Sequence, residues 1–560
     1  MLAERNSRVG PRHFRPAYAL VALLLAISGT AFGVSAAANA DADSPVKVAI
    51  IVPLVVPHSD TGLLTADDLV QYTSPLGLLT RQLDAVIDRP VALAIDPMII
   101  VSIRALGAAA PLTATDWLDR LAAASNQTFA LAYSDTDLTL ATQAGAPIIP
   151  APQSFDFALD AANFAPASAA TATPAPTAPP TTSTPPAWPS TQTLLDWPYS
   201  LSGIAWPGED TVVTKDLKPL AASGYTTAIL SSSNVNREAG AGASVKVGDE
   251  GVLVSDAPVS VALRSAARAV SDDEWNSAMV VLRAAIQAAG ASQPAGATVL
   301  GTFDREVPFT GGRLSETVSA LATTSDVLDV PISSVIAGPA TKATISEKPQ
   351  PDDRVLLATR VLAAERSEQL FASVAKSPLA VTAPRRLEVL SLFGNQWQSN
   401  LVAWPAAAED FLAASKDLTS SVSVVAGSRI NLLADRATLP IAVTNKLDQA
   451  VTVYITIEPD TALLAVESSA IKLVIEPNSQ GKGQVPVQAI SNGRVGITIS
   501  LASASGVAIG SPTRASINVQ AGWETPVVVV LAALVVGTFA AGIVRVIFRR
   551  RRESARGNDE

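Results

Sequence analysis

Cysteine is absent from this sequence, and histidine occurs only twice in 560 residues, at His13 and His58. The lack of cysteine excludes disulfides, thiolate nucleophiles and zinc sites with cysteine ligands. Two histidines are too few for a histidine-rich metal site, and a Ser-His-Asp triad depends on His58 if the N-terminus is removed. We therefore expect no metal site and no cofactor, and any catalysis would rest mainly on carboxylates, tyrosine, lysine or arginine.

Charged residues are also scarce, at 16%, whereas hydrophobic residues make up 48% of the chain. This much apolar side chain excludes a chain that is disordered throughout, and the length suits about three to four domains. Between residues 41 and 544 the sequence has 30 basic and 46 acidic residues, a net charge of −16. So acidic a surface argues against a nucleic-acid partner.

Residues 1–40 have the pattern of a secretory signal peptide. Four arginines precede an apolar stretch over 17–32, and Ala38-Asn39-Ala40 is a small-residue cleavage signal. An uncleaved anchor is the alternative, although the apolar run is short for a bilayer span of about 20 residues. The sequence does not decide whether cleavage follows Ala40 or a neighbouring residue.

A second apolar stretch lies near the other end, where residues 526–544 carry no charge. Its length predicts one transmembrane helix over 524–548, and a buried helix of a soluble domain is the alternative. Arginines dominate the tail at 549–560, which predicts a cytoplasmic C-terminus. The lipid bilayer is then a partner through 524–548, and we expect a single-pass protein of the cell membrane with the bulk of the chain extracytoplasmic.

An α/β barrel-like domain is predicted over 41–345. Eight short apolar runs suit buried parallel strands, and helix start signals such as those at Thr65 and Ser271 lie between several of them. The runs are 46–52, 91–95, 129–132, 201–205, 226–230, 251–254, 298–302 and 327–330. An Ala-, Thr- and Pro-rich segment over 163–196 interrupts this domain and is expected to be a disordered insertion.

Two further regions complete the predicted multidomain fold. Long amphipathic patterns predict a small helical region over 346–420. Residues 421–521 contain about seven short runs in which apolar and polar side chains alternate, separated by turn residues. That pattern predicts an immunoglobulin-like β-sandwich directly before the transmembrane helix.

Several short motifs also follow one another in a recognisable order, and they end with the membrane helix and its arginine tail. The motifs lie at 92–97, 132–138, 204–207, 224–227 and 443–448, with a helix that ends at Trp397. This order resembles that of an uncharacterised actinobacterial membrane-protein family, a domain of unknown function encoded beside the lipid II flippase of peptidoglycan synthesis. The resemblance implies a cell-envelope setting and supplies no catalytic residues.

The first domain is loosely similar to barrels of the glycosidase and polysaccharide-deacetylase type, and this similarity directs attention to the strand ends. Asp96, Asp135 and Asp304 follow predicted strands and would form a carboxylate cluster if the strands closed into one barrel. Glycoside hydrolysis needs two such carboxylates. Tyr133 and Trp206 would supply an aromatic face for a sugar. A deacetylase would require an aspartate with two histidines on a metal, which this chain does not supply.

Each of these residues also has a structural interpretation. Asp96 and Asp135 precede predicted helices, so both can serve as N-caps. Asp304 stands beside Arg305, which predicts a local ion pair or a place for Arg305 in the same cleft. His58 ends the first strand, where it is either a lone general base or a hydrogen-bonded loop histidine.

Three functions remain open on the sequence. The first is an envelope protein without a demonstrable catalytic motif that binds or scaffolds cell-wall glycan or its synthesis machinery. The second is a glycan-processing enzyme that uses Asp96, Asp135 and Asp304. The third is a structural spacer or adhesin without a ligand. The sequence does not identify a ligand, a protein partner, an oligomeric state or glycosylation.

Overall fold

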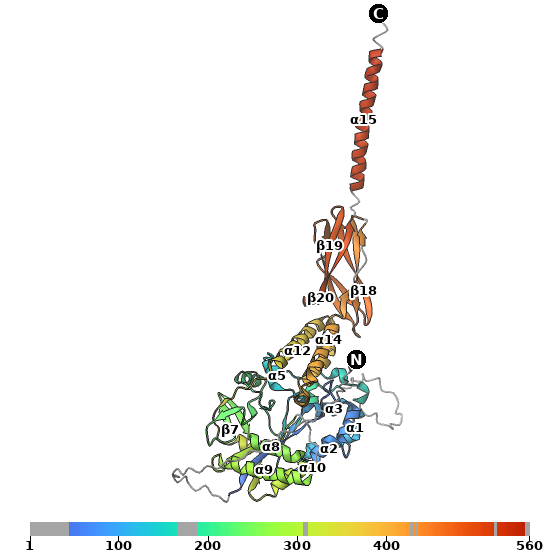
Figure 1. Cartoon of the computed structure of the whole chain (residues 1–560). Coiled ribbons are helices and arrows are strands. Elements are labelled where there is room, and N and C mark those ends of the chain that lie inside the picture. Colours follow the sequence, from blue (N-terminus) through green and yellow to red (C-terminus); the bar gives the residue numbers. More distant parts are fainter. Residues whose placement is uncertain are drawn as a thin grey trace, which may run out of the picture. The chain divides into compact units, whose positions relative to one another are not determined.

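The computed structural model describes residues 44–164, 188–305, 312–425, 430–432, 434–519 and 524–554 (Figure 1). Residues 45–560 form one unit, separate from residues 1–44. The expected signal peptide at 1–40 therefore lies outside the described residues, as does most of the expected insertion over 163–196. The end of that insertion is helical. Ser190 is the N-cap of α6 (Thr191–Leu195), and its hydroxyl accepts a hydrogen bond from the Thr193 N–H.

Five parallel strands form the first sheet, and β1 (Val46–Leu54) is its centre. Its partners are β2 (Ala92–Ile95), β9 (Thr298–Thr302) and β10 (Val327–Asp329), and β3 (Thr128–Ala130) pairs with the far side of β2. Residues 48–54 of β1 are all buried. A parallel strand that is covered on both faces reads as a continuous apolar run, which explains the pattern seen in the sequence.

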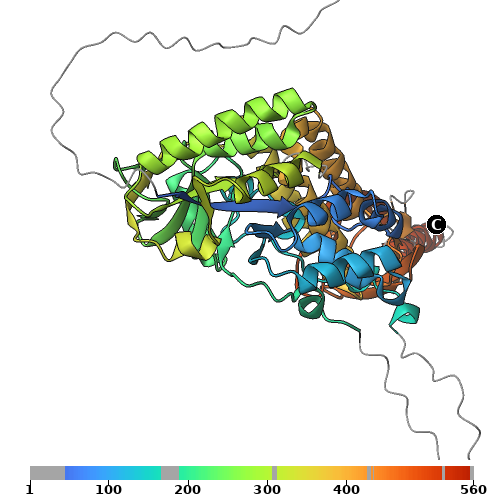
Figure 2. The same cartoon turned by 90° about the horizontal axis from the view of Figure 1, so that it is seen from below.

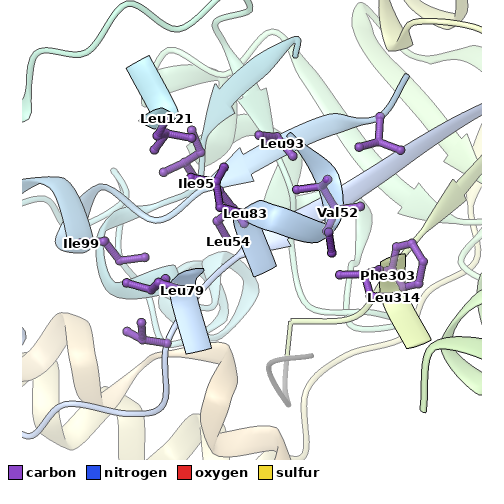
Figure 3. Packing of buried hydrophobic residues seen from close by; sticks show 14 of the residues in the cluster. Val52, Leu54, Leu79, Leu83, Leu93, Ile95, Ile99, Leu121, Phe303 and Leu314 are labelled. Atoms are coloured by element: carbon purple, nitrogen blue, oxygen red, sulfur yellow. The ribbon is translucent and has the colours of Figure 1, made fainter. Parts of the chain in front are cut away.

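Helices pack on this sheet through one large apolar core. They are α1 (Ala66–Thr73), α2 (Leu78–Val86), α3 (Pro97–Ala105), α4 (Leu112–Ala123), α8 (Ala257–Arg268), α9 (Asp272–Ala291) and α10 (Gly312–Ala322). Figure 3 shows side chains of α2 and α3 directed at those of the strands, among them Leu83 and Leu93. Helices α8 and α9 lie side by side and join the same core (Figure 2). The predicted helix starts at Thr65 and Ser271 are both confirmed as capping boxes.

A second, mixed sheet follows in the chain. Its order is β4 (Ile204–Ala205), β5 (Thr227–Ser231), β8 (Glu250–Ser255), β7 (Ser244–Val247), β11 (Thr341–Ile345) and β6 (Val235–Arg237). The first three are parallel, whereas β7 is antiparallel to β8 and β6 is antiparallel to β11.

The eight predicted strands all exist, and each predicted run overlaps a strand of one of the two sheets. The sheets meet at two places: the Leu201 N–H before β4 donates to the Thr128 oxygen of β3 at 3.0 Å, and the Asp256 N–H after β8 donates to the Leu300 oxygen of β9 at 2.8 Å. Apolar side chains of strands from both sheets share one core. The antiparallel strand β7 pairs with β8 along residues 250–253, however, so the second sheet is mixed. The described chain is therefore a multidomain mixed α/β structure in this region, and the single barrel stays a prediction.

The predicted helical region is confirmed as three helices, α12 (Asp352–Phe371), α13 (Pro378–Leu392) and α14 (Trp404–Thr419). Pro384 lies inside α13 rather than at its start. A short 3-10 helix, η7 (Asn395–Asn400), follows α13 and carries Trp397. Helix α5 (Leu138–Gln143) shares a core with these helices and with the second sheet.

Two curled antiparallel sheets occupy residues 422–519. One has the order β12 (Val422–Val424), β14 (Arg436–Asn445), β18 (Ser479–Ala489) and β16 (Leu464–Val466); the other has β13 (Ile430–Leu432), β20 (Ala508–Val519), β19 (Gly493–Ala502), β15 (Val451–Pro459) and β17 (Ile471–Ile475). Strand β13 alone runs parallel to its neighbour among these described strands. Buried residues alternate with more exposed ones along β15 and β19, and both sheets contribute to one core. The predicted alternation is thus confirmed.

The last element is α15 (Glu524–Ser554). Its stretch Val527–Arg552 is the one helix of the described chain that is long and apolar enough to span a membrane. Its most apolar window has a mean hydropathy of 2.8, and none of that window is buried. The helix fits a single-pass membrane protein with a short tail. It extends through Arg549–Arg552, so the predicted tail begins as helix, and residues 555–560 lie outside the description.

Candidate functional site

The carboxyl ends of β2, β3 and β9 meet at one edge of the first sheet, because these strands are parallel. Asp96 directly follows β2, and Arg305 comes shortly after β9. The segment Tyr133–Asp135 comes shortly after β3. Side chains that are far apart in the sequence therefore lie together here, as the strand-end argument predicted.

A buried ion pair between Asp135 and Arg305 is the centre of this site. Nη1 of Arg305 contacts Oδ1 of Asp135, and the two side chains are 6% and 0% exposed, respectively. Nη2 of Arg305 donates to the carbonyl oxygens of Trp206 and Pro207 at 2.6 and 2.8 Å. The guanidinium carbon lies 4.6 Å from the centroid of a Trp206 ring, within cation–π distance. Arg305 thus joins the end of β3 to the chain after β4.

Asn395 is a further partner of Asp135, and sequence reasoning missed it. Its Nδ2 donates to the backbone oxygen of Asp135 at 2.8 Å and to Oδ1 at 3.2 Å. Asn395 belongs to η7, 260 residues away along the chain, and no local motif marks it.

The backbone at Ser134 and Asp135 is left-handed, with φ values of 56° and 43°. Non-glycine residues rarely adopt this conformation, and it persists where surrounding contacts impose it. Here the Ser134 N–H donates to Oδ1 of Asp96 at 2.9 Å, and Arg305 and Asn395 hold the Asp135 side chain. This turn aims the Asp135 carboxylate at Arg305.

The capping interpretation is right for Asp96 and wrong for Asp135. Oδ1 of Asp96 accepts the Met98 N–H at 2.9 Å and so caps α3. The helix after Asp135 is capped instead by Asp137, whose Oδ1 accepts from the N–H groups of Thr139 and Leu140. The reason is the left-handed turn, which carries Asp135 away from the start of α5.

Burial dominates the electrostatics of both carboxyls. It raises the pKa of Asp96 to about 8, and the neighbouring charge of Asp135 adds to that rise. Burial likewise raises the pKa of Asp135 to about 6, although Arg305 opposes the rise. Both groups resist ionisation because the low-dielectric surroundings disfavour the charged form.

Asp304 lies apart from this pair of aspartates in its contacts. Its Oδ1 accepts from Nη2 of Arg268 at 2.7 Å, so Asp304 has an ion-pair partner on α8. Asp304 lines a cavity of about 30 Å³ together with Trp206 and Arg305, whereas Asp96 and Asp135 do not line it. That volume holds one or two waters rather than a sugar ring, because ligand pockets usually measure about 300–1,000 Å³.

The two aromatic candidates are occupied by protein contacts. The hydroxyl of Tyr133 donates to the Gly62 oxygen at 2.8 Å, and the residue is 6% exposed. A ring of Trp206 faces the Arg305 guanidinium and lies 6.4 Å from Phe129. Tyr133 is therefore buried and bonded to the protein, and the half-buried Trp206 ring already holds the Arg305 guanidinium.

His58 has contacts that resemble a Ser-His-Asp triad. Its Nε2 lies 3.1 Å from Oδ1 of Asp60, and its Nδ1 lies 3.3 Å from Oγ of Ser391. Ser391 is 1% exposed, however, and its hydroxyl donates to the Ser59 oxygen. A substrate therefore has no access to this hydroxyl. Burial lowers the pKa of His58, with Asp60 opposing the shift, so the imidazole is neutral near pH 7.

A second buried polar network surrounds Asp137, which sequence reasoning did not select. Its Oδ2 accepts from Nε2 of Gln350 at 2.7 Å and lies 3.5 Å from Nη1 of Arg354. The guanidinium of Arg354 lies 5.4 Å from a ring of Trp404. Asp137, Gln350 and Arg354 thus connect α5 to the start of α12. Within the described ranges, no group of three or more His, Asp or Glu side chains is arranged to hold a metal.

Short matches exist among solved structures. Native Escherichia coli alpha-2-macroglobulin matches 18% of this chain at 17% identity and a TM-score of 0.15, over 7% of its own length. The Caenorhabditis elegans MSP family member WR4 matches 18% of this chain at 11% identity and a TM-score of 0.14, over 98% of its own length. The Escherichia coli chaperone DraB matches 18% of this chain at 11% identity and a TM-score of 0.15, over 55% of its own length. Matches with TM-scores this low carry no argument.

Family membership rests on a much longer match. No curated protein matches the sequence. A family described as "Family of unknown function (DUF6049)" matches residues 7–556, nearly the whole chain. The chain therefore belongs to this family of unknown function.

Proposed function

We propose that the chain is an extracytoplasmic binding or scaffolding protein of the cell envelope, held in the membrane by α15. The apolar helix with its arginine-rich end carries this proposal. Arginines after a membrane span favour a cytoplasmic tail, and residues 45–519 would then lie on the outer side. Cell-wall glycan or its synthesis machinery, with the lipid II flippase as first candidate, is the partner that the family resemblance implies.

The contacts of the three aspartates favour this role over glycan hydrolysis. Asp96 caps a helix, Asp135 pairs with Arg305, and Asp304 pairs with Arg268. A retaining or inverting glycosidase needs two carboxyl groups that flank the scissile bond. Carboxyls that are bound to different protein groups and do not share one cavity are poorly placed for that chemistry.

The absence of cysteine makes the topology directly testable. Single-cysteine variants Ala504→Cys, before α15, and Ser554→Cys, at its end, are expressed in the native host. We expect a membrane-impermeant maleimide to label Ala504→Cys in intact cells and Ser554→Cys only after lysis. The reverse pattern would contradict the proposed orientation.

The partner is tested with the full chain purified in mild detergent. We expect the flippase or a glycan synthase to co-purify, and to be lost when residues 523–560 are exchanged for an unrelated membrane span and tail. If no specific partner co-purified with either the wild-type chain or the exchanged variant, the result would favour a structural spacer. Hydrolysis of cell-wall glycan by the wild-type chain, lost in Asp96→Asn, would favour the glycan-processing enzyme.

A further inference from the structure

A groove beside His58 is separate from the strand-end site and has the dimensions of a ligand pocket. Its volume is about 350 Å³, within the usual range of about 300–1,000 Å³. The loop after β1 forms one wall through His58 and Asp60. Helices α13 and α14 form the rest, with Trp397 of η7 between them.

Aromatic rings line this groove. The imidazole of His58 and a ring of Trp397 lie with centroids 4.3 Å apart. Phe411 contributes a third ring, and the guanidinium carbon of Arg385 already lies 3.9 Å from its centroid. The groove thus contains an internal example of a cation held against an aromatic face.

The charges of the groove are predominantly negative. Its lining includes three carboxylates, Asp60, Glu388 and Asp410, and a single guanidinium, that of Arg385. Arg385 is committed to Glu388 and to the buried Glu368 behind it. His58 adds no positive charge near pH 7, because burial lowers its pKa. The lining therefore carries a net of two negative charges.

Asp410 is the carboxylate best placed to meet a ligand. It is exposed on α14, and no ion pair of Asp410 is found in the part of the chain that the structure describes. An incoming ammonium or guanidinium group would gain the attraction of Asp410 and Asp60 while its carbon stem covers the Trp397 and Ala407 surface.

From these features we infer that the groove binds an organic cation, an ammonium or guanidinium group on an aliphatic stem. The inference rests on the proposed binding role and gives that role a site. A lysine or arginine side chain of a partner protein and a free polyamine share this chemistry. An anionic ligand would meet repulsion from the carboxylates, and a neutral sugar would gain nothing from the groove's charge.

The test uses the full chain in detergent and saturation-transfer NMR of the ligands. The probes are the methylamides of Nα-acetyl-lysine and Nα-acetyl-arginine, spermidine, N-acetylglucosamine as the neutral probe and glutarate as the anionic probe. We expect the cations to bind and the sugar and glutarate not to bind. Stronger binding of the amino-acid amides than of spermidine would identify a protein side chain as the source, and the opposite order a polyamine.

Two variants locate the binding. Asp410→Asn should weaken cation binding roughly two- to fivefold, the range expected for one exposed charge. Asp417→Asn, on the same helix outside the groove, should leave it unchanged. Higher salt should weaken binding to the wild type by screening. Equal binding of the sugar, no binding of any cation at millimolar concentration, or equal loss in both variants would overturn the inference. None of these outcomes bears on the maleimide topology test, so the two proposals fail separately.

Discussion

The region up to residue 420 and the two C-terminal sheets use charge in opposite ways. The first region buries ion pairs such as Asp135–Arg305 and Glu368–Arg385, whose carboxylates are 0% exposed. In the C-terminal sheets, an ion pair joins Arg436 and Glu467, whose side chains are 75% and 41% exposed. The C-terminal core is mainly apolar, and buried residues alternate with more exposed ones along strands such as β15.

This difference shows that apolar burial and buried ion pairs contribute differently to a fold. Apolar burial is non-directional, so an alternating core stabilises the sheets without requiring particular partners. A buried charge needs a partner in a defined place, and breaking such a pair is far more costly than breaking an exposed one. We therefore expect the first region to be sensitive to single charge removals and the C-terminal sheets to be sensitive only to core truncation.

The largest effect is expected for Arg305→Met. This change leaves Asp135 buried without its counter-ion and should lower the free energy of unfolding by about 3–5 kcal/mol. Chemical denaturation followed by circular dichroism measures the loss. The matched change in the C-terminal sheets is Arg436→Met. An equal loss in both variants would remove the distinction between the two regions.

Core truncation should affect the C-terminal sheets almost as strongly. Ile497 of β19 is 2% exposed and packs in the shared core of both sheets. Ile497→Ala should cost about 2–5 kcal/mol, the range for a buried isoleucine or leucine. The control is Thr498→Ala at the neighbouring half-buried residue on the other face of the strand, which should cost much less. A small effect of Ile497→Ala in denaturation would argue against a tightly packed core.

The pH dependence of stability should report on Asp96. Its pKa is about 8 in the folded chain and near 4 when unfolded, so the folded state holds a proton that the unfolded state releases. That contribution is fully present below pH 4 and is lost as pH rises through 8, with a slope of up to about 1.4 kcal/mol per pH unit. Asp135, with a pKa of about 6, contributes only in the lower part of this window.

The Asp96→Asn variant isolates this effect. It keeps the oxygen that accepts from Met98 and Ser134 but does not ionise. Denaturation midpoints measured from pH 6 to 8 should fall with pH in the wild type and fall less in the variant. Parallel pH profiles would mean that Asp96 is not the group that titrates.

The smallest effect is expected at exposed ion pairs. Arg436→Met should cost no more than about 1 kcal/mol and less at high salt, because its partner Glu467 is also largely solvated. Glu409→Gln, which breaks the exposed pair with Arg360 in the first region, should behave alike. If Glu409→Gln lowered the free energy of unfolding as much as Arg305→Met, the region of the chain, and not the burial of the ion pair, would determine the cost of breaking it.

Sequence reasoning predicted local features better than the network between them. The alternation along β15 and the capping boxes at Thr65 and Ser271 were readable because their signals lie within a few residues. The strand-end rule also placed Asp96 and Asp135 near each other, as their electrostatic interaction indicates.

The partners of Asp135 were not predictable in the same way. Arg305 and Asn395 lie 170 and 260 residues from it, and their pairing depends on how the sheets and helices pack. The left-handed turn at Ser134 carries no glycine to announce it. The contacts between the two sheets were unreadable for a similar reason, since the hydrogen bonds from Leu201 to Thr128 and from Asp256 to Leu300 join residues that are far apart in the sequence.

The central claim is that the Asp135–Arg305 pair is a structural link and not a reaction centre. The most direct test compares Arg305→Met with the double variant Asp135→Leu/Arg305→Met. Replacing both charges removes the uncompensated carboxylate, so the double variant should regain at least half of the stability lost by the single one. It should also keep wild-type co-purification of partners. A double variant that folds as stably as expected but loses its partner, or loses hydrolysis of cell-wall glycan, would contradict the claim.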